Sequence, residues 1–257
     1  MTELRAIVGA MSLFFVMGTT QAQNTQYEAA LNGWSRVLSR FVDADGRVDF
    51  RALAGDRADL DQFIEYIAGV SPGSHSDLFA TPAQVLTYHI NAYNALAMHG
   101  VIEEGIPAGF TSLFRRLIFF KFHRIVVGGT PTSLSDYENK VIRPLGEPRV
   151  HFALNCMVRD CPRLPREPFR AEMLDSQLAA AAREFFSKVK HIRVDIDERE
   201  LWLSEILDFY TEDFVLGGKR QGLISYVNQY LSTPIDDDYQ VRFIPYDWTI
   251  NQSSVQK

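Results

Sequence analysis

The stretch from Val150 to Arg170 reads VHFALNCMVRDCPRLPREPFR and collects much of the chain's chemistry. It contains both cysteines, four arginines and three of the eleven prolines. Its first residues, VHFAL, are apolar enough to predict a buried strand. The spaced prolines that follow cannot continue a regular element, so the strand should end in a shaped loop. A strand that leads into a rigid loop rich in thiol and guanidinium groups is a good position for a site.

The whole chain is acidic and has an ordinary globular composition. It has 257 residues, of which 46% are hydrophobic and 23% charged, and its formal net charge is −6. These values fit one domain of about 230 residues or two small ones. The negative charge, with no block of lysine and arginine to offset it, argues against a nucleic-acid partner.

The first 22 residues have the regions of a secretory signal peptide in the expected order. Arg5 precedes an apolar run from Ala6 to Met17, and this run is too short to span a bilayer. Thr20 and Ala22 are small residues before a cut at Gln23. An uncleaved N-terminal anchor is the alternative. We expect an exported protein, periplasmic or secreted, without stable membrane insertion.

The predicted fold class is α+β, with helices packed around a small, mostly antiparallel sheet. Helices and strands are interspersed without a βαβ rhythm, and the chain has no glycine-rich phosphate loop and no G-x-S-x-G motif. We expect residues 23–80 to be an N-terminal helical segment of the same domain. Residues 81–251 should form the core of the domain, and residues 252–257 a flexible tail.

The clearest helix is predicted from Thr81 to about Glu104, because Thr81 is a good N-cap and Pro82 suits the first helical position. Asn91 and Asn94 share one face of this helix. Amides are costly to bury unpaired, so they should bond either the backbone of another element or a substrate. Other helices are expected over 27–41, 56–70, 133–143, 171–186, 206–214 and 222–231. Residues 117–129 should form a strand or a hairpin and residues 150–154 a strand. Strands over 191–197 and 198–204 should pair through the turn at 197–199, and residues 241–251 should form a strand and an ordered tail.

One short segment resembles the beginning of a calcium loop, with Asp43, Asp45 and Gly46 at suitable spacing. The twelfth position from Asp43 is Ala54, so no glutamate closes the loop. A turn into a short strand over 48–50 is the better interpretation. We expect no metal and no other cofactor.

Five segments stand in a characteristic order, and together they resemble the domain-of-unknown-function 547 family. They are HINAYNALAMHGVI (89–102), TSLSDYENKVIRP (132–144), VHFALNCMVRDCPRL (150–164), LSEILDFYTEDF (203–214) and YDWTIN (246–251). The resemblance implies an exported single-domain bacterial protein. It further implies a papain- or transglutaminase-like core that uses Cys, His and Glu, and that binds glutathione-like thiol peptides.

The chain departs from this family pattern at two positions. His89 replaces the tryptophan before Ile-Asn, and Asn139 replaces the histidine that follows Glu138. If that histidine is the general base of the family, this protein lacks it there. Asparagine cannot take up a proton at neutral pH, although it can orient a neighbour.

The cysteines are the candidates for chemistry, and three interpretations of them stay open: a catalytic thiol, a disulfide and an inert core thiol. Arg159, Arg163 and Arg166 would lower a thiol pKa and could hold a carboxylate. His151 is the nearest histidine, but in a strand it faces away from Cys156. The chain must therefore turn near Asn155, or His89 or His123 must supply the base.

Three hypotheses of function follow from these residues. The first is a cysteine-dependent peptidase or acyl transferase, with Cys156 as nucleophile, His151 as base, Glu138 orienting the base and Asn91 stabilising an oxyanion. The second is a non-catalytic module that binds a small acidic or thiol peptide through Arg159, Cys161, Arg163, Arg166 and Asn94. The third is a scaffold with a protein partner, which a long exposed apolar patch would favour.

Overall fold

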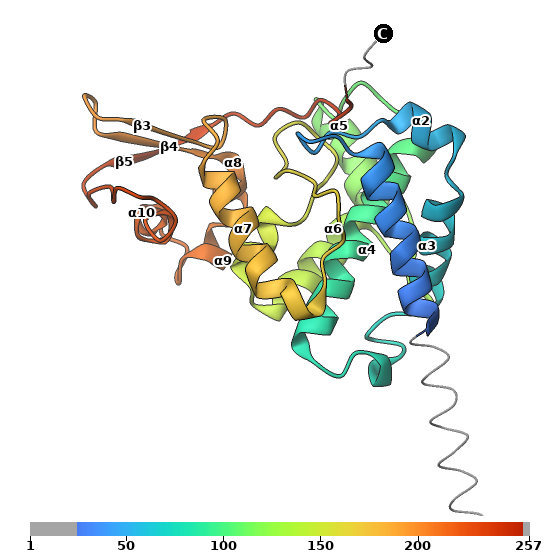
Figure 1. The fold of residues 1–257 in the computed structure, drawn as a ribbon. Coiled ribbons are helices and arrows are strands. Elements are labelled where there is room, and N and C mark those ends of the chain that lie inside the picture. Colours follow the sequence, from blue (N-terminus) through green and yellow to red (C-terminus); the bar gives the residue numbers. More distant parts are fainter. Residues whose placement is uncertain (1–24, 254–257) are drawn as a thin grey trace, which may run out of the picture.

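The computed structural model describes residues 25–253 (Figure 1). The predicted signal peptide lies outside these residues, as does most of the predicted tail. Within residues 25–253, no helix has both the length and the apolar character needed to cross a membrane.

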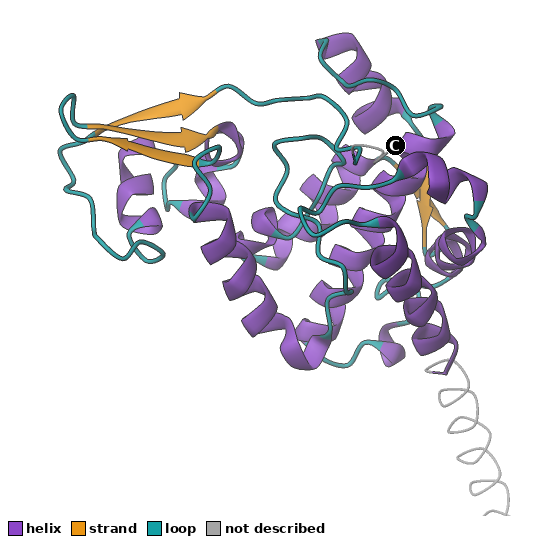
Figure 2. Ribbon diagram, turned by 45° about the horizontal axis from the view of Figure 1, so that its top comes forward, coloured by secondary structure: helices purple, strands orange, loops and turns teal. Residues whose placement is uncertain are grey.

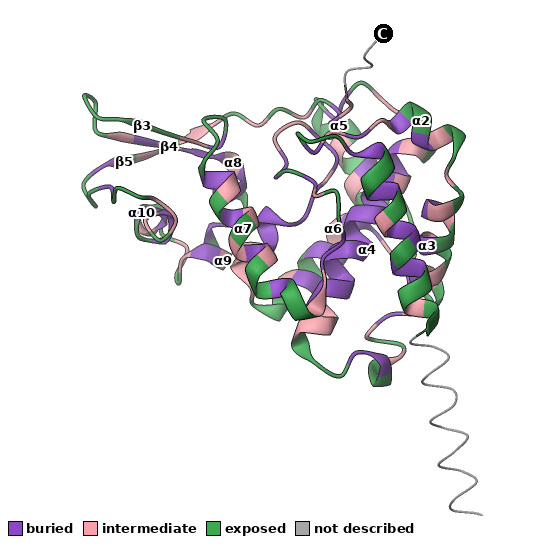
Figure 3. Cartoon of the chain, viewed as in Figure 1, coloured by how far each residue is buried: buried purple, intermediate pink, exposed green. Residues whose placement is uncertain are grey.

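A buried helix, α4 (Pro82–Glu103), runs through the middle of the helical part (Figure 3). It begins as the sequence predicts. Thr81 Oγ1 accepts from the amide of Gln84, the Gln84 side chain accepts from the amide of Thr81, and Pro82 is the first helical residue. Every residue from Leu86 to Met98 is buried, so α4 is surrounded by packing on all sides.

The N-terminal helices cover one side of α4 and share its hydrophobic core. They are a helix over 25–41, α2 (Phe50–Gly55), α3 (Ala58–Gly69) and the short 3₁₀ helix η1 (Ser76–Leu78). Leu60, Phe63 and Ile67 form the buried stripe of α3, as their spacing predicts. Phe63 stacks on Trp34 with ring centroids 5.8 Å apart, which joins α3 to the first helix.

The turn over 43–46 is confirmed, because Asp43 Oδ1 accepts from the amides of Asp45 and Arg47. The strand expected after it is reduced to the isolated bridges of Val48, and Asp49 then caps α2.

The rest of the helical part is built from short segments, several of them π or 3₁₀ helices. In order they are α5 (Leu113–Arg116), η2 (Leu117–Phe122, π), α6 (Leu134–Tyr137), η3 (Glu138–Ile142, π), η4 (Arg143–Leu145), η5 (Pro148–Phe152), η6 (Ala171–Met173), α7 (Leu174–Phe186), α8 (Glu205–Phe209), α9 (Thr211–Phe214), η7 (Arg220–Gly222) and α10 (Leu223–Val227).

The strands form two small sheets, and the α+β class is confirmed. The hairpin β1 (Ile125–Val127) and β2 (Thr130–Thr132) is antiparallel. In the second sheet β3 (Ile192–Asp195) pairs antiparallel with β4 (Glu200–Ser204), and β4 pairs parallel with β5 (Gln240–Ile244). Figure 2 shows this sheet at one end of the molecule, so helices flank it on one side instead of surrounding it.

Two predicted strands are wrong, and both lie in apolar runs. The run Val150–Leu154 is largely the 3₁₀ helix η5, which begins at Pro148 and is capped by the Glu147 side chain. Leu117–Phe122 is helical, although Ile125–Val127 after it does form a strand. Burial makes both runs apolar, and a short apolar run does not distinguish a strand from a helical turn. The helix that begins at Ser133 also continues past Pro144, as 3₁₀ helix, to Leu145.

Candidate functional site

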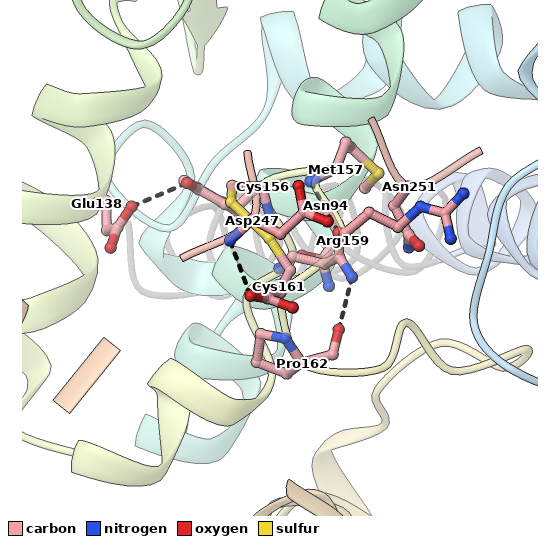
Figure 4. Close-up of a disulfide and its surroundings, with 12 residues drawn as sticks. Asn94, Glu138, Cys156, Met157, Arg159, Cys161, Pro162, Asp247 and Asn251 are labelled. Carbon is pink, nitrogen blue, oxygen red and sulfur yellow. Dashed lines mark hydrogen bonds between the residues drawn. A yellow bond between two sulfur atoms is a disulfide. The ribbon is translucent and has the colours of Figure 1, made fainter. Parts of the chain in front are cut away.

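Cys156 and Cys161 form a disulfide, with their Cα atoms 6.3 Å apart (Figure 4). The chain has no other cysteine. Cys161 is buried, whereas Cys156 is half-buried. Of the three interpretations of the cysteines, the structure contains the disulfide, so neither sulfur is a free thiol.

The two asparagines of α4 hold both ends of the segment that contains the disulfide. Asn94 Nδ2 donates to the carbonyl of Ala153 at 3.0 Å, and its Oδ1 accepts from the amide of Asn155 at 2.7 Å. Asn91 bonds Phe169 in the same way, at 2.9 Å to the carbonyl and 3.0 Å from the amide. Both side chains are buried. They are internal clamps on the backbone, one of the two outcomes expected for them.

A third asparagine shapes the loop from within. Asn155 Nδ2 donates to the carbonyl of Pro162 at 2.7 Å, and its Oδ1 accepts from the amide of Met157 at 2.8 Å. Met157 has φ +66°, a left-handed backbone conformation that residues other than glycine adopt at a cost in free energy. The amide and carbonyl contacts on both sides of Met157 therefore hold the loop in a shape that the local sequence does not favour.

His151 lies on η5 and faces away from the disulfide, into a buried cluster. Its ring stacks on Tyr210 with centroids 4.0 Å apart, and its Nε2 lies 2.7 Å from Asp213 Oδ2. Because a carboxylate only accepts, this nitrogen carries the proton. Among residues 25–253, the side chain of His151 has Tyr210, Asp213 and Phe214 as partners, and Cys156 is not one of them. The geometry does not pair His151 with the sulfur as a base.

Asp213 connects His151 to Arg143, which donates to it through Nε at 2.7 Å and Nη2 at 2.8 Å. Burial alone would raise the pKa of Asp213, but the hydrogen bonds from His151 and Arg143 hold this pKa well below its usual range. Arg143 also donates to Asn139 Oδ1 at 2.6 Å. Asn139, where the family pattern has histidine, thus supports the arginine that supports Asp213.

Glu138 is buried and accepts a hydrogen bond from a tyrosine hydroxyl. Tyr93 donates to its Oε2 at 2.8 Å, and the carboxylate also lies near Tyr210. Burial and the adjacent carboxylate raise the pKa of Tyr210 well above its usual value. Tyr210, whose ring stacks on His151, therefore lies near Glu138, and the expected direct contact between Glu138 and His151 is absent from the described residues.

A cleft of about 580 Å³ opens beside the disulfide, between the loop and α7. Of the residues predicted to bind a ligand, Arg159, Cys161 and Arg163 line it. Arg166 lies outside the cleft and donates to the carbonyl of Ser39 at 2.7 Å. Asn94 does not line the cleft, because its side chain bonds the backbone of Ala153 and Asn155.

The cleft is rich in cations for a protein of net negative charge. Arg163 is paired with Glu184 at 2.6 Å. Four other lining cations have no carboxylate within ion-pair distance in the described part of the chain: Arg47, Arg159, Lys188 and Lys190. Asp45, Asp160 and Asp247 also line the cleft and partly offset them. A ligand with more than one carboxylate complements this arrangement.

His191 also lines the cleft, in a buried position against Phe185, with ring centroids 3.8 Å apart. Burial lowers its pKa to about 3, so its ring is neutral, and its Nδ1 has no hydrogen-bond partner among the described residues. Sequence reasoning missed His191 and both lysines, because they follow α7 and meet the loop only in the folded chain. It also missed Asp213, although the segment LSEILDFYTEDF, which carries the family resemblance, contains it.

Comparison with known proteins supports the resemblance over part of the chain. Residues 79–186 match the family model described as "Protein of unknown function, DUF547". This span contains α4, η3, η5 and the disulfide loop. No curated protein matches the chain, and no solved structure does.

Proposed function

We propose, from the DUF547 match and the geometry of the cleft, that this protein is an exported, non-catalytic binding protein for a small acidic peptide, including thiol peptides of the glutathione type. The cleft carries the proposal, because it places Arg159 and Arg163 beside Cys161 and adds three more cations. Its volume is in the range of small-ligand sites. Guanidinium groups bind carboxylates in a bidentate manner, so Arg159 is the expected anchor.

The oxidised cysteines support binding over catalysis. The thiolate is the nucleophile of a cysteine enzyme, and a disulfide has none. Asn139 stands where the family pattern has a histidine, the expected base, and asparagine cannot accept a proton.

A cysteine-dependent peptidase or acyl transferase, with the papain- or transglutaminase-like core that the resemblance implies, is the alternative for the reduced protein. Glu138 is a buried carboxylate, as this alternative requires, and this burial favours it.

Calorimetry with a matched pair of arginine variants tests the proposal. The ligands are S-methylglutathione, which cannot exchange with the disulfide, an acidic dipeptide and neutral diglycine. We expect the two acidic ligands to bind and diglycine not to bind. Arg159→Gln should weaken binding by about tenfold or more, the size of a lost charge-assisted hydrogen bond. Arg166→Gln makes the same charge change outside the cleft and should bind like the unmodified protein.

Two results would count against the binding protein. One is the absence of binding across the acidic ligands, and the other is an equal loss of affinity in both arginine variants. Mass spectrometry of the ligand after several hours separates the alternative. Product that forms only after reduction, and not in Cys156→Ser, would favour the thiol enzyme.

Export is part of the same proposal and has its own test. A disulfide persists in oxidising compartments, which is consistent with a periplasmic or secreted protein. The intact mass of the purified protein should correspond to a chain that begins at Gln23. A full-length mass in a membrane fraction would favour the uncleaved anchor.

A further inference from the structure

A row of exposed apolar side chains runs along the helical segment formed by α5 and η2. Phe114 is 72% exposed, Phe122 67%, Leu113 65%, Leu117 42% and Ile118 37%. Leu113 and Leu117 are one turn apart, as are Phe114, Ile118 and Phe122, so they share a face. We call these five residues the apolar face. Monomeric soluble proteins rarely expose so many large apolar side chains together.

The opposite side of this segment is anchored in the core, so the apolar face is held outward. Phe119 is buried and stacks on Phe110 with centroids 4.2 Å apart. Phe120 contacts Trp248 edge to face at 6.1 Å, and the Arg116 guanidinium lies over the same indole at 4.6 Å. In Figure 1, α5 lies at the upper edge of the molecule, next to the C-terminal segment that contributes Trp248.

All the formal charges in the part of the chain around the apolar face are positive. Residues 105–135 contain no aspartate or glutamate, but they contain Arg115, Arg116, Lys121 and Arg124. Lys121 is paired with Asp136 from the neighbouring helix. Arg115 and Arg124 are exposed, and neither has an ion-pair partner within residues 25–253. A basic, aromatic segment on a protein of net charge −6 complements an anionic partner.

We propose that the apolar face docks on an anionic phospholipid surface. Basic helices with phenylalanine and leucine on one side lie in the membrane interface, where the apolar side chains enter the acyl boundary and the cations meet lipid phosphates. A second copy is a poor partner, because two such faces would bring Arg115 and Arg124 against like charges. The side chains project from the helix, which suits a deformable lipid surface without a preformed pocket. This docking is independent of the ligand bound in the cleft.

Vesicle sedimentation with three matched variants tests the docking. The protein is used as purified, with the same N-terminus verified by intact mass in every variant. We expect it to sediment with vesicles of phosphatidylglycerol and phosphatidylcholine, and not with phosphatidylcholine alone. Raising the salt concentration should weaken the binding. Phe114→Ser with Phe122→Ser, and separately Arg115→Gln with Arg124→Gln, should each lower the partition coefficient by about tenfold or more.

The control is Ile196→Ser with Leu216→Ser, two apolar residues that are 74% and 102% exposed on other parts of the surface. This variant should bind within about twofold of the unmodified protein, since neither residue belongs to the apolar face. No vesicle binding, or equal binding by the Phe114/Phe122 variant, would overturn the proposal. Sedimentation velocity decides what replaces it. A dimer that the phenylalanine substitutions abolish would assign the face to a second copy, and a monomer without lipid binding would favour a protein partner.

Discussion

Replacing Asn94 with alanine should destabilise the protein far more than the loss of one exposed side chain. Asn94 makes two hydrogen bonds to the backbone of the disulfide loop, and it is 2% exposed. Alanine leaves the carbonyl of Ala153 and the amide of Asn155 without partners where water has little access. Each unsatisfied group costs about 1–3 kcal/mol. For two such groups, the expected loss in the free energy of unfolding is therefore about 2–6 kcal/mol.

Asn228 provides a matched control, because it makes the same pair of bonds to one residue. Its amide donates to the carbonyl of Ile235 and accepts from the amide of Ile235, both at 2.8 Å. Asn228 is only half-buried, so water can replace part of what alanine removes. Asn228→Ala should cost about 1 kcal/mol, roughly the net value of a partly solvated hydrogen bond.

Urea unfolding of the oxidised proteins, followed by circular dichroism, measures this difference. The midpoints can be compared only if the denaturant slopes agree. A loss below about 1 kcal/mol for Asn94→Ala, or a loss no larger than that of Asn228→Ala, would refute the reasoning. Asn91→Ala should behave like Asn94→Ala, since its bonds to Phe169 have the same form. If Asn91 stabilised an oxyanion instead, its replacement would spare stability.

Three further predictions concern a partly buried ion pair, a buried histidine and the disulfide. Asp213→Asn should cost about 3 kcal/mol, because Arg143 and His151 both bond this carboxylate; an equal loss in Asp208→Asn, whose pair with Arg220 is more exposed, would contradict this. Burial lowers the pKa of His89 to about 4 from 6.5. Below pH 6.5 the unfolded chain therefore takes up a proton that the folded chain does not, and stability should fall by roughly 2 kcal/mol by pH 5. His89→Gln removes this titrating group, so the stability of the variant should fall less between pH 6.5 and pH 5. If the urea midpoints of both proteins depend on pH in the same way, the assignment to His89 is wrong. Reduction of the Cys156–Cys161 disulfide should lower the free energy of unfolding by about 2 kcal/mol, the chain-entropy value for a short loop; unchanged urea midpoints with and without reductant would exclude that estimate.

The parts of the fold that local chemistry determines could be predicted from the sequence. Thr81, Pro82 and Gln84 specify the start of α4 within four residues. The hairpin of β3 and β4 follows from two apolar runs on either side of a charged turn. The parallel pairing of β4 with β5 has no such signal, because the two strands are separated by residues 205–239. Pairing over that distance depends on how α8, α9 and α10 pack, which no periodicity describes.

The candidate site was less predictable than the fold, because irregular backbone sets the direction of its side chains. Arg159 and Arg163 line the cleft, but Arg166, three residues further, bonds Ser39 elsewhere. The strand rule that placed His151 opposite Cys156 does not apply to a 3₁₀ helix. The left-handed conformation of Met157 then turns the loop in a way that the local sequence does not reveal.

Asn139 shows how a departure from the family pattern can be accommodated physically. Its Nδ2 donates to the carbonyl of Ser135 at 2.7 Å while its Oδ1 accepts from Arg143. Arg143 is thereby positioned to bond both oxygens of Asp213, and Asp213 in turn bonds His151. An uncharged amide can fill this place because it offers a donor and an acceptor at once, whatever its protonation equilibrium. The position therefore supports a partly buried charge network here, and this network needs no proton transfer from Asn139.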